Sequence, residues 1–73
     1  MQRYSVTLHG HRTSVSLEPE FWVVLKQAAE REEMSVAALI QHIDDERLNA
    51  SLPSGLSSAV RVYLLQYLQN QQG

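Results

Sequence analysis

The sequence predicts a mostly helical domain with a short N-terminal β-ribbon, held in a homodimer, and three observations carry this expectation. Apolar and polar residues alternate through residues 3–17, and from Pro19 onward apolar residues recur at helical spacing. No loop separates the extended segment from the first helical one. The last helical segment has apolar residues on several sides, and the other elements of one small chain are too few to bury all of them.

Length and composition limit the means of stabilisation. The chain has 73 residues, so we expect a single domain over residues 1–73. A domain of this size buries only about 60% of the surface of its unfolded chain. There is no cysteine, hence no disulfide or thiolate zinc site. No apolar run approaches the roughly 20 residues of a membrane span, and no signal peptide is visible, so we expect a cytoplasmic protein.

Charge is distributed unevenly along the chain. The formal net charge is -2, which does not by itself suggest a nucleic-acid binder. Residues 1–17 nevertheless contain Arg3, His9, His11 and Arg12 and no carboxylate, and all eight acidic residues lie from Glu18 onward. The function of the domain has to explain this asymmetry.

The extended segment allows two interpretations, because Gly10 interrupts its alternation. One is a hairpin that turns around His9-Gly10-His11 and pairs an extra strand over residues 3–9 with a ribbon strand over residues 12–18. The other is a loose N-terminal arm before a single strand. The hairpin is favoured.

Three helices are expected to follow, over about residues 19–33, 35–48 and 54–69. Pro19 suits the first position of a helix, where its missing N–H costs nothing. Ser35 is a good N-cap for the second helix. The acidic "DDE" sits poorly at the end of that helix and indicates fraying into "NASLPSG".

The third helix predicts dimerisation. Its stretch "VRVYLLQYL" leaves only Arg61 and Gln66 polar across nine positions. Another copy of the chain is the simplest supplier of the missing surface. The expected dimer core consists of Val15, Leu17, Trp22, Leu39, Ile43, Tyr63 and Leu65.

A single strand also has unpaired backbone groups on its edges. If two copies pair the strand over residues 12–18 antiparallel, Val15 and Leu17 cover the helices, and Arg12, Ser14 and Ser16 face away from the protein. A two-stranded ribbon fits the major groove of B-DNA. We therefore expect double-stranded DNA as a partner, with these three outward residues at base edges.

The stretches "LHGHRTSVSLEPEFW", "SVAALI" and "SSAVRVYLLQYL" resemble the ribbon-helix-helix superfamily of the Arc and methionine repressors, and are similar to a compact bacterial subfamily of it. The resemblance implies an intertwined homodimer, here with a third C-terminal helix, that acts as a transcriptional regulator. It also implies that Ser35 and Val36 anchor a DNA phosphate, as the free N–H groups of a helix start are able to do.

Further phosphate contacts are expected from Arg3 and His11. Two features depart from the family pattern and would repel DNA: "EEM" stands where members often have Gly before the second helix, and Glu18 ends the ribbon.

The remaining polar residues favour structural roles. His9 and His11 provide too few ligands for a metal, so no metal or cofactor is expected. Arg61 projects from an apolar helix and is expected to pair with an acid such as Glu18, Asp44 or Asp45. The runs "EREE" and "DDE" are interpreted as solvated faces.

The sequence shows no sign of an enzyme. It has no cysteine nucleophile, no Gly-rich phosphate loop and no cluster of His and carboxylates at ligand spacing, so no catalytic residues are expected. The alternative function is a dimeric protein-interaction module, or an antitoxin-like adaptor, with weak or no DNA binding and an unknown protein partner. The tail "QNQQG" is too short to wrap a toxin.

Overall fold

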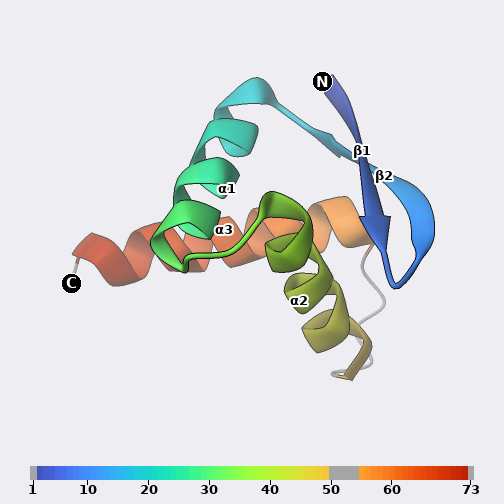
Figure 1. Cartoon of the computed structure of the whole chain (residues 1–73). Coiled ribbons are helices and arrows are strands. Elements are labelled where there is room, and N and C mark those ends of the chain that lie inside the picture. Colours follow the sequence, from blue (N-terminus) through green and yellow to red (C-terminus); the bar gives the residue numbers. More distant parts are fainter. Residues whose placement is uncertain (1, 50–54, 73) are drawn as a thin grey trace.

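The computed structural model describes residues 2–49 and 55–72, and it shows a β-hairpin followed by three helices (Figure 1). The elements are β1 (Gln2–Leu8), β2 (His11–Leu17), α1 (Pro19–Arg31), α2 (Val36–Asn49) and α3 (Leu56–Gln72). The expected fold class, mostly helical with a short N-terminal ribbon, is confirmed. The loop expected over residues 50–54, and the expected helix start at residue 54, lie outside the described residues.

The two strands pair antiparallel through a tight turn. His9 and Gly10 form this turn, with φ of 52° and 77°. Positive φ at both central residues is what a type I′ turn requires, and its twist matches that of a hairpin. The His9 backbone N–H also donates to Gln41 Oε1 on α2, at 3.0 Å. The hairpin interpretation is therefore confirmed, and the loose arm is wrong.

One chain therefore supplies both strands of a two-stranded ribbon, which corrects the expectation of a lone strand. β1 pairs with one edge of β2 along its whole length. On the other edge, the Ser16 N–H donates to Ser57 Oγ at 3.0 Å, and the Ser16 carbonyl accepts from Arg61 Nη2 at 3.2 Å. These two backbone groups of Ser16 need no second copy, because α3 satisfies them.

The helices cover one face of the hairpin. In Figure 1 the hairpin lies near the start of α3, and α3 runs behind α1 towards a C-terminus far from the strands. The Tyr4 ring stacks on Trp22 of α1, with 3.9 Å between ring centroids. The buried core draws on all five elements and consists of Val6, Leu8, Val15, Leu17, Leu25, Ala28, Ala29, Leu39, Ile40, Ile43, Val60 and Leu64.

The residues expected in the dimer core have three different environments. Val15, Leu17, Leu39 and Ile43 are buried inside the single chain. Trp22 and Tyr63 are partly buried against that same core. Leu65 is 54% exposed. Most of this set therefore packs within the chain, and only Leu65 presents a large open surface.

Local signals in the sequence set the helix starts. Pro19 occupies the first turn of α1, as expected. The Ser35 hydroxyl accepts from the Ala38 N–H at 3.0 Å, so the expected N-cap of α2 is confirmed. Asp44, expected on a solvated face, is instead only 9% exposed. Its carboxylate accepts from Arg47 Nη2 at 2.6 Å, one turn along α2, which compensates its burial.

The end of α1 has a residue in an unfavourable backbone conformation. The Met34 N–H donates to the Ala29 carbonyl and the Glu33 N–H donates to the Glu30 carbonyl, the two bonds of a Schellman motif. Such an ending places one residue in the left-handed region, and glycine is preferred there. Glu33 occupies this position with φ of 58°. The "EEM" turn therefore keeps the backbone shape that Gly would favour.

Glu33→Gly is expected to stabilise the fold by about 1 kcal/mol, because glycine lacks the Cβ that disfavours positive φ. Urea denaturation followed by circular dichroism measures the change. Glu33→Ala is the matched control, since it removes the carboxylate but keeps the Cβ. Equal stabilisation by both variants would show that charge, and not backbone strain, is the cause.

Candidate nucleic-acid interface

The face of the hairpin opposite the core is polar and carries no acidic side chain. The paired register aligns Arg3 with Ser16, Ser5 with Ser14, and Thr7 with Arg12. By alternation these six side chains share one face, while Val6, Leu8, Val15 and Leu17 are buried on the other. We call this set the ribbon face: Arg3, Ser5, Thr7, Arg12, Ser14 and Ser16.

The ribbon face brings together four residues that the sequence placed in the site. Arg12 and Ser14 are exposed, Ser16 is partly buried, and Arg3 lies diagonally across from Arg12. Neither strand contains Asp or Glu, so the guanidinium groups are the formal charges of this face. Such a surface combines positive charge with hydroxyls that donate or accept hydrogen bonds at base edges.

Ser5 and Thr7 are members of the ribbon face that sequence reasoning missed. The signal that would have found them is an internal repeat. Residues 3–8, "RYSVTL", and residues 12–17, "RTSVSL", are identical at four of six positions. In the hairpin register, Arg3, Ser5 and Thr7 correspond to Arg12, Ser14 and Ser16 under a two-fold rotation about the centre of the Ser5–Ser14 pair.

Side-chain contacts join each end of the ribbon to a helix. At the turn, the His9 Nε2 atom lies 2.7 Å from Asp45 Oδ1 on α2. At the end of β2, Glu18 accepts from Arg61 Nε at 3.2 Å and Nη2 at 3.1 Å. The expected pairing of Arg61 with an acid is therefore confirmed, and Glu18 is the one of the three candidates that it contacts. These contacts join the turn of the ribbon to α2 and its end to α3.

The negative charge of Glu18 would repel DNA less than the sequence suggests, because Arg61 is paired with it. A hydrogen bond from its own backbone N–H and the guanidinium of Arg61 hold the pKa of Glu18 below its ordinary value of 4.5. The group is thus ionised at neutral pH, and the adjacent guanidinium offsets its charge. Arg61 also lies over the Phe21 ring, 5.8 Å from its centroid.

The start of α2 lies beside the β1 edge of the ribbon. A surface hollow of about 370 Å³ is lined by Ser5, Val6, Thr7, Arg12, Trp22, Val36 and Ala37. Part of the ribbon face and the N-terminal turn of α2 thus border the same depression. An anion in it would meet both Arg12 and the free N–H groups of a helix start.

His11 is not brought to the ribbon face. It pairs with Leu8, and so lies on the side of the hairpin that faces the helices. It lines a different hollow together with His9, Thr13, Asp44 and Arg47. Of the other expected phosphate contacts, Arg3 belongs to the ribbon face itself. Val36 lines the hollow beside that face, and Ser35 directly precedes Val36 as the N-cap of α2.

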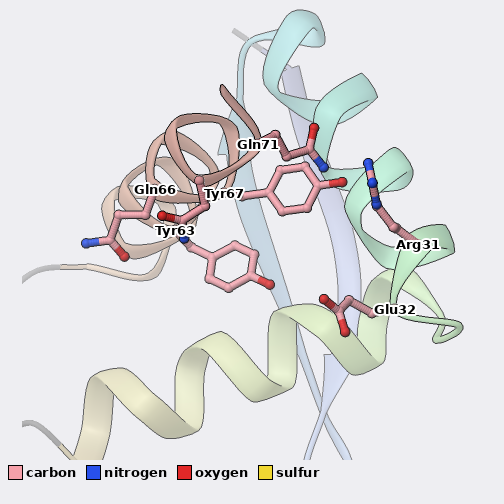
Figure 2. Close-up of a pocket in the computed structure, with 7 residues that line it drawn as sticks. Arg31, Glu32, Tyr63, Gln66, Tyr67 and Gln71 are labelled. Carbon is pink, nitrogen blue, oxygen red and sulfur yellow. The ribbon is translucent and has the colours of Figure 1, made fainter. Parts of the chain in front are cut away.

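A third hollow lies away from the ribbon, between the end of α1 and the later turns of α3 (Figure 2). It measures about 470 Å³, and Tyr63 and Tyr67 project into it towards Arg31 and Glu32. Burial raises the pKa of the Tyr63 hydroxyl, with a smaller contribution from the charge of Glu32. Its other lining residues are the amides Gln66, Asn70 and Gln71.

An apolar row runs along the outside of α3. Val62, Leu65 and Leu68 are 51%, 54% and 40% exposed, and their spacing places them on one side of the helix. Across the described residues, no helix is long and apolar enough to cross a lipid bilayer. Within residues 2–49 and 55–72, no three His, Cys, Asp or Glu side chains converge as metal ligands.

The hairpin, the helices and the polar ribbon face define a ribbon-helix-helix domain. The model of the family described as "Ribbon-helix-helix domain" matches residues 1–68, and the chain belongs to this family. Among solved structures, it is similar to an uncharacterized protein from Bordetella pertussis Tohama I, with 38% identity and a TM-score of 0.82. The match covers 97% of this chain and 58% of that protein. No curated protein matches the sequence.

Proposed function

We propose that this protein is a DNA-binding regulator that inserts its ribbon face into the major groove of double-stranded DNA. The observation that carries the proposal is a complete two-stranded ribbon with two arginines, four hydroxyls and no carboxylate on its open face. A ribbon of two strands has the width of the major groove, and Arg is the side chain that most often reads guanine there. Membership of the ribbon-helix-helix family supports the same function.

In this proposal the residues divide into two roles. Arg12, Ser14 and Ser16 approach base edges, because they project from the open face of β2. Arg3 and the first turn of α2, with Ser35 and Val36, approach phosphates beside the ribbon. Phosphate contacts orient the protein, and base contacts provide the sequence preference.

We further propose that the protein acts as a homodimer. The ribbon does not require a second copy, but α3 exposes Val62, Leu65 and Leu68 in a row. Contiguous exposed apolar surface of this kind is typical of interfaces. A dimer through α3 would carry two separate ribbons.

Selection from random duplex DNA, followed by fluorescence anisotropy on the selected site, tests DNA binding. We expect a consensus, and we expect Arg12→Ala to weaken binding. If Arg12 neutralises a phosphate, the variant should also lower the slope of log affinity against log salt by about one unit. Arg31→Ala, at the far end of α1, is the matched control and should bind like wild type. If wild type yields no consensus, the adaptor function stands instead.

A further inference from the structure

The repeat in the hairpin has a consequence for what the ribbon recognises. A two-stranded ribbon built from two identical chains has a true two-fold axis, and both halves of its face are the same. Here one chain supplies both strands, yet the outward residues Arg-x-Ser-x-Thr and Arg-x-Ser-x-Ser are related by an approximate two-fold rotation. Burial explains the matching apolar positions, because any half-buried hairpin needs them. Burial does not explain matching arginines and serines on the open face.

The geometry also gives a spacing. Arg3 is aligned with Ser16, and Arg12 with Thr7, so the two arginines lie four residues apart along the ribbon and on opposite strands. At about 3.3 Å per residue this is a separation of about 13 Å. Base pairs of B-DNA are about 3.4 Å apart. The arginines therefore span about four base-pair steps in one groove.

We propose that a single chain reads a short inverted repeat, with Arg3 and Arg12 each contacting a guanine in opposite halves of the site. This inference rests on the proposed DNA-binding function and deepens it. In this inference Arg3 contacts a base edge, as Arg12 does, and not a phosphate. The Ser5–Ser14 pair then lies over the centre of the site. One intrachain hairpin thereby takes the role that two paired chains would otherwise share.

The test uses the full chain on short duplexes that hold one selected site: the intact site and the site with one half scrambled. Wild type should bind roughly 10- to 100-fold more weakly when one half is scrambled, because one arginine then has no guanine to bind in a bidentate manner. Arg3→Ala should bind the intact and half-scrambled duplexes about equally, since it is able to orient its remaining arginine onto the intact half. Arg12→Ala should behave in the same way. Both residues are exposed, so circular dichroism should show an unchanged fold.

The outcomes separate this inference from the proposed function. Suppose that Arg12→Ala no longer distinguishes the intact from the half-scrambled duplex, whichever half is scrambled, and that Arg3→Ala still distinguishes them like wild type. Then β2 alone reads the bases, and the inference is overturned. A consensus without inverted symmetry overturns it as well, and leaves DNA binding intact. Failure of wild type to select any consensus overturns the proposed function itself.

Discussion

Leu17→Ala is expected to leave the protein largely unfolded at room temperature. Leu17 ends β2, is completely buried, and belongs to the core shared by the hairpin and the helices. Truncating a buried leucine removes apolar contacts and leaves a cavity, at a cost of about 2–5 kcal/mol. The core of a domain of this size supplies only about 3–5 kcal/mol of stability. The loss is therefore comparable with the whole stability of the fold.

Circular dichroism during urea titration measures this effect. Leu48→Ala is the matched control, because Leu48 on α2 is 57% exposed and its truncation should change stability by no more than about 0.5 kcal/mol. A Leu17→Ala variant as stable as Leu48→Ala would mean that the hairpin does not contribute to the core as the structure shows.

Leu65→Asp is expected to separate the proposed dimer without unfolding the chain. Leu65 lies in the middle of the exposed row on α3, so a carboxylate there would be buried against the apolar row of the second copy. In the single chain the same carboxylate remains in solvent, where it costs little. Sedimentation at micromolar concentration should give twice the chain mass of 8.3 kDa for wild type, and 8.3 kDa for the variant.

Asn70→Asp provides the control for added charge, since Asn70 lies on a different side of α3 and lines the hollow beside the tyrosines. It should sediment like wild type, and both variants should keep their helical spectrum. A wild-type protein that sediments as a well-folded monomer would rule out this dimer.

Much of the fold was predictable because its signals are local. Pro19 and Ser35 mark helix starts through their own chemistry, and Gly10 marks the turn because it interrupts the alternation of the extended segment. The position of Arg61 on an apolar helix predicted an acidic partner among Glu18, Asp44 and Asp45, and the structure shows the contact with Glu18. The helix starts and the turn depend on a few neighbouring residues, whereas the contact between Arg61 and Glu18 joins residues 43 positions apart and depends on the tertiary fold.

The rest depended on which elements meet in space. Nothing in "DDE" shows that Asp44 faces the core, because its burial is set by the packing of α2 against its neighbours and is compensated by Arg47. The ribbon face was predicted from β2 alone, and Ser5 and Thr7 were missed because period-2 alternation does not say which strands pair. The backbone conformation of Glu33 was likewise hidden, since glutamate gives no sign of a left-handed position.

The intrachain hairpin finally affects how the protein responds to its own concentration. A ribbon assembled from two chains exists only after a bimolecular encounter, so at low abundance the assembled fraction falls with dilution. A ribbon closed by the turn at His9 and Gly10 forms unimolecularly, as hairpins do within about 1–10 μs. The surface proposed to contact DNA is therefore present in every folded molecule. For a single short site, occupancy would then rise in proportion to the number of chains at low abundance, and not with its square.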